Sequence, residues 1–171
     1  MSLDGYIADT AGGVAWLGGD GSGGADDMGS YPQFISTVDT VVMGYKTYHQ
    51  IVTELSPGNW FYKGKTSYVL THRSETSTDE IIFVRESAGA LIKTLRAKDG
   101  KSIWICGGAD VANQLIALDL IDRYHITVIP TILGGGVRLF GAHSAARPLR
   151  LVSTACYGGM TDLVYERRAQ K

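Results

Sequence analysis

Two adjacent glycines, Gly107 and Gly108, lie between the apolar segment 103–106 and the helix-like pattern of residues 111–116. A backbone without Cβ atoms approaches a ligand closely and adopts angles that are closed to other residues. Where a parallel strand runs into a helix, the helix N-terminus also offers free amide donors and a partial positive charge, which suit a pyrophosphate. A tight turn that binds nothing explains the glycine pair equally well. Other parts of the chain must decide between these interpretations.

Two further predicted strands end in residues of similar character. The buried run Val41–Met43 leads into Gly44 and Lys46, and a second apolar run ends before His72 and Arg73. The carboxyl ends of parallel strands meet at one edge of a sheet, so we expect these residues to converge with the glycine pair. Cationic and imidazole side chains there suit a dianion such as the 2'-phosphate of NADPH. Each of them alone is also explained as solvated surface charge.

Other motifs in the chain carry less weight. Residues 19–24 formally satisfy the G-x-G-x-x-G pattern, but that pattern needs a strand before it and a helix after it, and the flanking residues predict a flexible loop. The histidines have no spacing typical of metal ligands: His49, His72, His125 and His143. We therefore expect neither a Rossmann fingerprint nor a metal site.

Composition limits the class of protein. The chain has 171 residues, is 44% hydrophobic and carries 16 Lys and Arg against 17 Asp and Glu, which predicts one compact domain with no nucleic-acid or membrane partner. Cys106 and Cys156 each end an apolar run, and we interpret them as buried, reduced thiols. Without an apolar run of membrane-spanning length or a signal peptide, we expect a soluble, cytoplasmic protein.

Short apolar runs alternate with helical periodicity, which is typical of a sheet covered by helices. Ser87 is a candidate N-cap for a helix with Leu91 and Leu95 on one face, and Val111, Leu115 and Leu118 mark the stripe of another. Gly158 and Gly159 separate the last two runs, as in an antiparallel hairpin. The predicted strands cover residues 2–8, 40–43, 67–71, 81–84, 102–106, 124–129, 149–157 and 160–167.

Three ordered motifs resemble the dihydrofolate reductase-like family, and within it the branch of the riboflavin-biosynthesis reductase domain. They are the segments 2–8 (SLDGYIA), 39–48 (DTVVMGYKTY) and 103–116 continued through 120–122 to 129–140 (IPTILGGGVRLF). The resemblance covers nearly the whole chain. It implies an α/β fold of three layers, α/β/α, with a mostly parallel central sheet and an antiparallel C-terminal hairpin, as a single domain over residues 1–171. It also implies a cis peptide between Gly107 and Gly108.

The resemblance further implies an NADPH site whose residues come from all three motifs and from the strand end at residue 71. These residues are Ile7, Ala8, Gly44, Tyr45, Lys46, Thr47, Thr71, His72, Arg73, Cys106, Gly107, Gly108, Ala109, Asp110 and Val111. Tyr45 stands where folate enzymes carry an arginine, so part of the 2'-phosphate clamp must come from Lys46, His72 or Arg73.

The candidate catalytic residues are Asp27 and Asp4. Asp26 and Asp27 lie near the spacing of the acid that dihydrofolate reductases carry in their first helix, but offset from it; they are equally well explained as solvated loop acids. Asp4 belongs to the motif shared with the riboflavin branch, and an Asp before a Gly is also a common turn former. The family usually has apolar residues before the segment that begins at Met1, so we expect either missing first residues or a shortened strand.

The sequence therefore predicts an NADPH-dependent reductase that transfers hydride to a C=N or C=O bond of a small pteridine-like or ribosylamino-pyrimidine-like compound, similar to 5-amino-6-(5-phosphoribosylamino)uracil reductase. The alternative is a nucleotide-binding module of the same fold without substantial catalysis. We also expect a homodimer, because the C-terminal hairpin would otherwise leave an apolar edge with Leu163, Val164 and Tyr165 exposed.

Overall fold

The computed structural model describes residues 1–22, 28–142 and 146–168. Its backbone forms two compact units. The middle unit is Gln33–Leu120, and the terminal unit joins Met1–Pro32 to Ile121–Lys171. The expectation of one domain stays a prediction.

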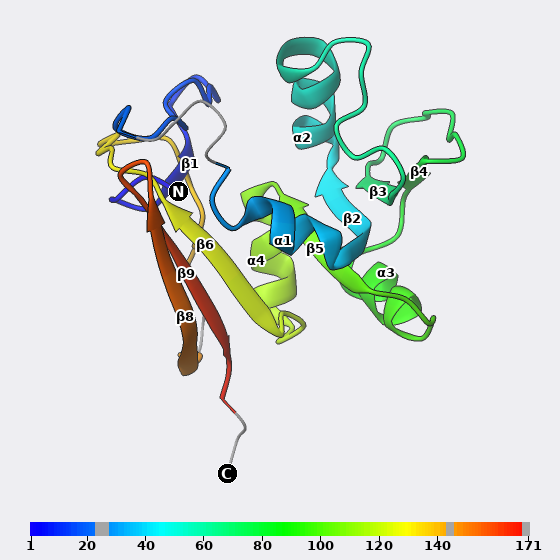
Figure 1. Cartoon of the computed structure of the whole chain (residues 1–171). Helices are drawn as coiled ribbons and strands as arrows, with labels where there is room; N and C mark the ends of the chain where they lie inside the picture. Colours follow the sequence, from blue (N-terminus) through cyan, green and yellow to red (C-terminus); the bar gives the residue numbers. More distant parts are fainter. Residues whose placement is uncertain (23–27, 143–145, 169–171) are drawn as a thin grey trace. The chain divides into compact units, whose positions relative to one another are not determined.

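The middle unit is built on a parallel sheet of four strands in the order β4-β3-β2-β5 (Figure 1). These are β2 (Val38–Gly44), β3 (Thr66–Leu70), β4 (Ile81–Val84) and β5 (Ser102–Gly107). Val41, Val42 and Met43 are fully buried at the centre of the sheet, as is Val69 on the neighbouring strand. Their burial explains why β2 reads as a continuous apolar run, since a central parallel strand is covered on both faces.

Helices follow the strands of this unit at the predicted places. α2 (Tyr45–Gln50) continues into a π-helical turn, η1 (Ile51–Leu55), while α3 spans Ala88–Arg96 and α4 spans Ala109–Ala117. The Ser87 side chain accepts a hydrogen bond from the amide of Ala90, which confirms it as the N-cap of α3. The predicted stripe of α4 is wrong at Leu118, which is the C-cap and 58% exposed; Ile116 is buried instead.

The chain passes from the terminal unit to the middle unit within a short helix, α1 (Tyr31–Ser36).

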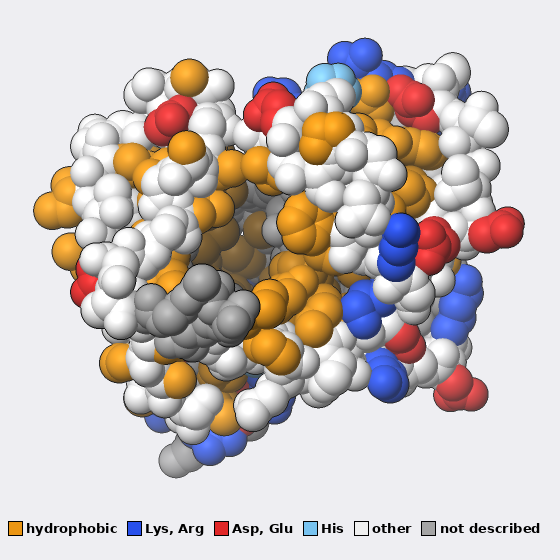
Figure 2. Space-filling view, turned by 45° about the horizontal axis from the view of Figure 1, so that its top comes forward, with side chains coloured by type: hydrophobic (Ala, Val, Ile, Leu, Met, Phe, Trp, Pro, Cys, Tyr) orange, Lys and Arg blue, Asp and Glu red, His pale blue; other side chains and the backbone are white. Residues whose placement is uncertain are grey.

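None of the helices among the described residues is long and apolar enough to cross a membrane. On the face shown in Figure 2, Lys and Arg side chains lie interspersed with Asp and Glu. This mixture agrees with the net charge of −1.

The terminal unit contains an antiparallel sheet in the order β6-β9-β8 (Figure 1). Its strands are β6 (Arg123–Val128), β8 (Leu149–Tyr157) and β9 (Met160–Arg167). The predicted hairpin is confirmed: Gly158 and Gly159 join β8 to β9 with φ of 50° and 74°. Both angles belong to the left-handed region, which the tightest hairpin turns need at both central residues and glycine adopts without strain.

The N-terminal segment forms less strand than predicted. Only β1 (Tyr6–Ala8) is a strand, paired with β7 (Val137–Arg138), while Ser2 makes an isolated bridge to Ile129. A turn interrupts the segment, because the amide of Gly5 bonds the carbonyl of Ser2 and Gly5 has a φ of 91°. β7 covers two residues, too few for an alternating pattern to indicate it.

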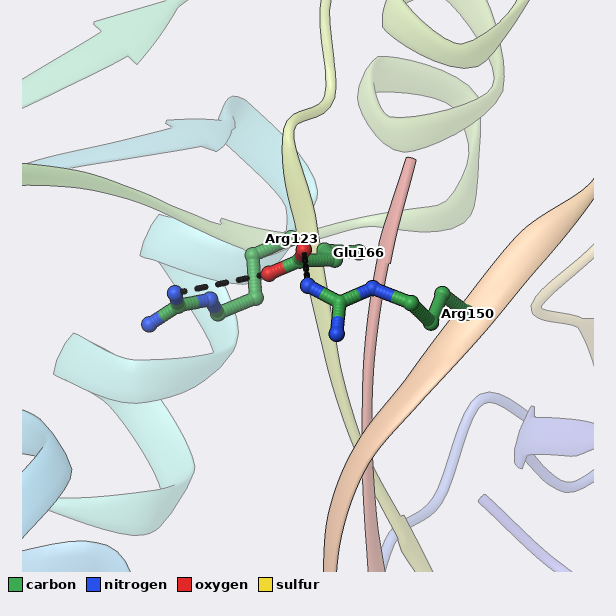
Figure 3. Close-up of polar contacts among 3 residues, drawn as sticks. All are labelled: Arg123, Arg150 and Glu166. Atoms are coloured by element: carbon green, nitrogen blue, oxygen red, sulfur yellow. Dashed lines mark hydrogen bonds and ion pairs between the residues drawn. The ribbon is translucent and has the colours of Figure 1, made fainter. Parts of the chain in front are cut away.

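One carboxylate forms ion pairs with both neighbouring strands of the antiparallel sheet. Glu166 on β9 lies opposite Arg123 on β6 and Arg150 on β8, and it forms an ion pair with each of them (Figure 3). The Arg123 Nη2–Glu166 Oε2 distance is 3.8 Å. Such cross-strand pairs contribute roughly 0.2–1 kcal/mol and favour this register over a shifted one.

The exposed edge of this sheet differs from the prediction. Leu163, Val164 and Tyr165 lie on the central strand β9 and are half-buried, whereas β8 is exposed from Arg150 to Cys156. The interpretation of Cys156 as a buried thiol is therefore wrong, because the apolar run that contains it forms an outer strand. Leu151 and Val152 are 50% and 44% exposed on the same strand.

The turn between β8 and β9 contacts the N-terminal segment at two places, residues 19–20 and residue 29. The amide of Asp20 donates to the carbonyl of Gly158 at 3.0 Å, and a Cβ at Gly19 would lie 1.9 Å from that oxygen. A Cβ at Gly29 would lie 2.1 Å from the Tyr157 ring. Glycine at positions 19 and 29 thus lets the backbone lie directly against the hairpin.

Candidate nucleotide-binding site

The three strand ends singled out in the sequence lie side by side in the middle unit. β2 pairs in parallel with β3 and β5, with Gly44 opposite Leu70 and Met43 opposite Gly107. The residues that follow these strands therefore begin at one edge of the sheet. This confirms the predicted convergence of the strand ends and places it where parallel sheets bind ligands.

Two helix N-termini meet at this edge. Gly44 is the N-cap of α2 and Gly108 is the N-cap of α4, and no side chain caps either helix. A Cβ at Gly44 would lie 3.4 Å from Cγ2 of Val111 and 3.9 Å from the amide nitrogen of Gly108, so the two first turns are close together. Amides at the start of a helix that no side chain caps are available to an anion.

The glycine pair has the geometry that the resemblance implies. Gly107 and Gly108 are joined by a cis peptide, which confirms that expectation. Gly107 has a φ of +149°, a conformation that side chains strongly disfavour, whereas Gly108 has a φ of −80° that any residue adopts. The Oγ1 atom of Thr47 lies 3.5 Å and 3.4 Å from Cβ positions built on the two glycines. Thr47 therefore faces the glycine pair.

Two of the predicted cationic residues lie at the start of α2: Lys46 belongs to its first turn, and Arg73 contacts its first residue, Tyr45. Lys46, His72 and Arg73 are all exposed. The guanidinium of Arg73 lies over the Tyr45 ring, 4.7 Å from its centroid, and the Arg73 amide donates to Oγ1 of Thr71 at 3.0 Å. Stacking on an aromatic face orients a guanidinium while its N–H groups stay free to pair with a phosphate.

Two predicted site residues use their side chains for other contacts. The Cys106 thiol lies 3.1 Å from the Tyr62 hydroxyl, and burial raises the pKa of Cys106 to about 11, so the thiol is protonated at neutral pH. The Asp110 carboxylate accepts a hydrogen bond from the Gln114 side chain at 2.8 Å. A bound ligand would therefore contact the backbone of these two residues and not a reactive side chain.

Three predicted residues belong to the terminal unit instead. Ile7 and Ala8 lie in β1. The Asp4 carboxylate accepts hydrogen bonds from the Ser2 hydroxyl at 2.7 Å and from the amides of Leu133 and Gly134 at 3.1 Å and 2.7 Å. The Ser2 bond, followed by the backbone bonds, lowers the pKa of Asp4 to about 2 against the opposing effect of desolvation. Asp4 is thus an ionised anchor for the loop after β6, and its catalytic role stays a prediction.

Asp26 and Asp27 lie outside the described residues, but the terminal unit contains a buried carboxylate that the sequence reasoning missed. Asp162 on β9 is 6% exposed. It accepts hydrogen bonds from the hydroxyls of Ser30, Thr127 at 2.5 Å and Tyr157 at 3.1 Å. An acidic residue directly before the apolar run of residues 163–165 was the available signal, because a buried charge needs partners that satisfy it.

Among the residues that the structure describes, no group of three or more His, Cys, Asp and Glu residues is arranged to hold a metal ion. The polar features of the site are helix amides, hydroxyls and cations, which suit an anionic organic ligand.

Residues 1–163 match the family described as RibD C-terminal domain. The chain is 39% identical over 170 residues to the uncharacterized protein YwjB of Bacillus subtilis (strain 168), covering 98% of this chain and 94% of that one. It is 27% identical over 176 residues to the uncharacterized protein YyaP of the same organism, covering 96% and 90%.

Solved structures show the same fold. A protein assigned to riboflavin biosynthesis from Shewanella sp. PV-4 is 28% identical with a TM-score of 0.84, covering 98% of this chain and 95% of that one. The Thermotoga maritima diaminohydroxyphosphoribosylaminopyrimidine deaminase/5-amino-6-(5-phosphoribosylamino)uracil reductase has a TM-score of 0.68 at 18% identity, covering 98% of this chain and 54% of that one. Enterococcus faecalis dihydrofolate reductase, complexed with NADP(H) and RAB-propyl, also has a TM-score of 0.68 at 18% identity, covering 98% and 92%.

These similarities confirm the predicted dihydrofolate reductase-like α/β fold, with its parallel four-stranded sheet and a separate antiparallel sheet. The match over residues 1–163 establishes that this chain belongs to the RibD C-terminal domain family.

Proposed function

We propose that this protein is an NADPH-dependent reductase that transfers hydride to a C=N or C=O bond of a small pteridine-like or ribosylamino-pyrimidine-like compound. The observation that carries the proposal is the meeting of two glycine-capped helix N-termini, those of α2 and α4, at the carboxyl edge of a parallel sheet. Two such N-termini side by side suit the two phosphates of a dinucleotide. The fold of a reductase and of an NADP(H)-bound dihydrofolate reductase supports the choice of cofactor.

The residues present fit a dinucleotide. The amides at the start of α4 would hold one phosphate and those of α2 the other, with the Thr47 hydroxyl beside the glycine pair as a further donor. Lys46, His72 and Arg73 would bind the 2'-phosphate. When bound, the cofactor supplies the hydride, and the protein supplies position and electrostatics.

A carboxylate near the acceptor would stabilise the positive charge that builds up during hydride transfer. Asp27 and Asp4 remain our candidates for this role, with Asp26 as a one-residue alternative to Asp27. Asp4 would act as a fixed negative charge rather than a proton donor, because its low pKa keeps it ionised at neutral pH.

Ligand-dependent melting tests the nucleotide site. NADPH at 100 times its dissociation constant stabilises a protein by about 2.7 kcal/mol, which is about 5–10 °C for a chain of this size. We expect this shift with NADPH, and a smaller shift with NADH at the same concentration. Arg73→Gln should reduce the NADPH shift, whereas Arg96→Gln, which removes an arginine that bonds the Leu120 carbonyl, should not. No shift with either nucleotide would reject the proposal.

Turnover distinguishes a reductase from the alternative, a nucleotide-binding module without substantial catalysis. The protein would be incubated with NADPH and a panel of dihydropteridines and ribosylamino-pyrimidines, and the loss of NADPH absorbance followed. Oxidation that depends on both protein and substrate supports the reductase. Nucleotide binding without oxidation across the panel would favour the binding module.

A further inference from the structure

One of the three cations proposed to bind the 2'-phosphate is held at both ends by the protein itself. The guanidinium of Arg73 lies over the Tyr45 ring, 4.7 Å from the ring centroid. The Arg73 amide donates to Oγ1 of Thr71 at 3.0 Å, and Thr71 is 9% exposed. Arg73 is therefore fixed at its backbone and at its charged group, although its side chain is exposed.

The ring beneath the guanidinium is itself anchored. Tyr45 is the first residue of α2 and packs against the buried core of the middle unit. Its ring lies 5.9 Å from the Tyr48 ring, centroid to centroid. Gly44, the residue before Tyr45, lies opposite Leu70 at the end of β3. The ring therefore stands beside the point where the chain leaves β3 toward Arg73.

The other two cations of the proposed site lack this support. Among the residues that the structure describes, the middle unit has one cation stacked on an aromatic ring, and that cation is Arg73. Lys46 and His72 are exposed and belong to no such stack in the described part of the chain. Arg73 is thus the cation whose charged group an aromatic ring orients.

A stacked guanidinium binds an anion at a lower cost than an unsupported one. An exposed arginine samples many rotamers, and a bound phosphate must restrict them at an entropic cost. On a ring, part of that restriction is already in place, and the N–H groups point outward from the edge of the guanidinium plane, where a phosphate accepts them. A ring at position 45 therefore strengthens the binding of a phosphate without contacting the phosphate.

We propose that Tyr45 is a positioning residue for the 2'-phosphate of NADPH: its ring holds the Arg73 guanidinium in the orientation that pairs with the phosphate, and the preference for NADPH over NADH depends on that ring. This role rests on the proposed function. NADH carries a hydroxyl where NADPH carries the phosphate, so the stack contributes to the binding of NADPH alone. The aromatic face makes the contribution, and the tyrosine hydroxyl does not.

A double-mutant cycle tests this role. NADPH and NADH would be titrated by isothermal calorimetry into wild type, Tyr45→Leu, Arg73→Gln and the double variant. We expect Arg73→Gln to lower the NADPH-to-NADH affinity ratio about 10-fold, as for one exposed charge-assisted bond. Tyr45→Leu should lower the ratio about 2- to 5-fold, as for an exposed cation–π contact. The double variant should lose no more than Arg73→Gln alone, because the ring acts through the guanidinium.

Three further variants serve as controls. Tyr45→Phe keeps the ring and should keep the wild-type ratio. Arg73→Lys keeps the charge at an exposed position but removes the planar group, so it should lower the ratio about as much as Tyr45→Leu does. Arg138→Gln removes the arginine that lies 4.8 Å from the centroid of the Tyr6 ring in the terminal unit, and it should leave the ratio unchanged.

The ratio separates positioning from a general disturbance of the fold, which would weaken both dinucleotides and leave their ratio unchanged. The proposal is overturned if Tyr45→Leu or Arg73→Lys keeps the wild-type ratio, or if Tyr45→Phe lowers it as much as Tyr45→Leu. It is also overturned if the two losses multiply in the double variant, or if wild type binds both dinucleotides equally. Failure of both dinucleotides to bind wild type would instead overturn the proposed function and this role with it.

Discussion

The glycine pair offers a sharp test, because its two members differ in what they require. Gly107 has a φ of +149°, and Gly108 has a φ of −80°. We expect Gly107→Ala to lower the free energy of unfolding by about 1–3 kcal/mol, the usual cost of a side chain in a sparsely populated backbone region. For a chain of 171 residues this corresponds to a fall in Tm of about 2–12 °C.

Gly108→Ala is the matched variant. Its new Cβ would meet only the Thr47 Oγ1 atom, at 3.4 Å, which is an ordinary contact. We expect the free energy of unfolding to change by less than about 0.5 kcal/mol, while NADPH binding weakens by roughly 10-fold or more because the methyl group occupies the approach to the α4 amides.

Urea denaturation and calorimetric titration of both variants would measure these effects. Equal destabilisation by the two substitutions would refute the argument from backbone angles. Undiminished NADPH affinity in Gly108→Ala would show that the pair is a turn without a role in binding.

Four further outcomes follow from the terminal unit and the thiols. The low pKa of Asp4 means that its bonds stabilise the fold above pH 3.8 and that this contribution is lost as the pH falls toward 2. Wild type should therefore be more stable than Asp4→Asn at neutral pH. Denaturation curves of the two proteins should converge as the pH is lowered from 3.8 to 2. An alkylating reagent at neutral pH should modify Cys156, which is exposed, and leave the protonated Cys106 unmodified; mass spectrometry that finds both labelled in the folded protein would contradict this. Asp162→Asn should lower the free energy of unfolding by about 2–4 kcal/mol, because a buried carboxylate loses its charge-assisted bonds, and an unchanged urea midpoint would argue against that network. We propose that two copies pair through the exposed outer strand β8. Light scattering should therefore give a dimer mass for wild type and a monomer mass for Val152→Lys, and a monomeric wild type would reject the pairing.

The parallel part of the fold was predictable because local sequence carries it. The run Val41–Met43 is apolar at every position, as a strand covered on both faces must be, and its glycine end marks the site. Ser87 is a helix cap whose bond reaches only three residues along the chain, so sequence alone identifies it.

The features that were missed depend on long-range contacts. Cys156 and Leu118 belong to apolar patterns, and no local signal says that β8 is an outer strand or that the helix ends before residue 118. Asp162 binds hydroxyls from three separate parts of the chain, and Asp4 binds amides about 130 residues away, at Gly134. Such partners are determined by the fold and cannot be read from spacing.

The hairpin turn that contacts both Gly19 and Gly29 has a consequence for how the family can diversify. Because Gly19 and Gly29 contact adjacent residues, Gly158 and Tyr157, a side chain at either position would collide with the hairpin turn. We therefore expect sequences that diverge from this one to keep glycine at both positions for as long as they keep this turn.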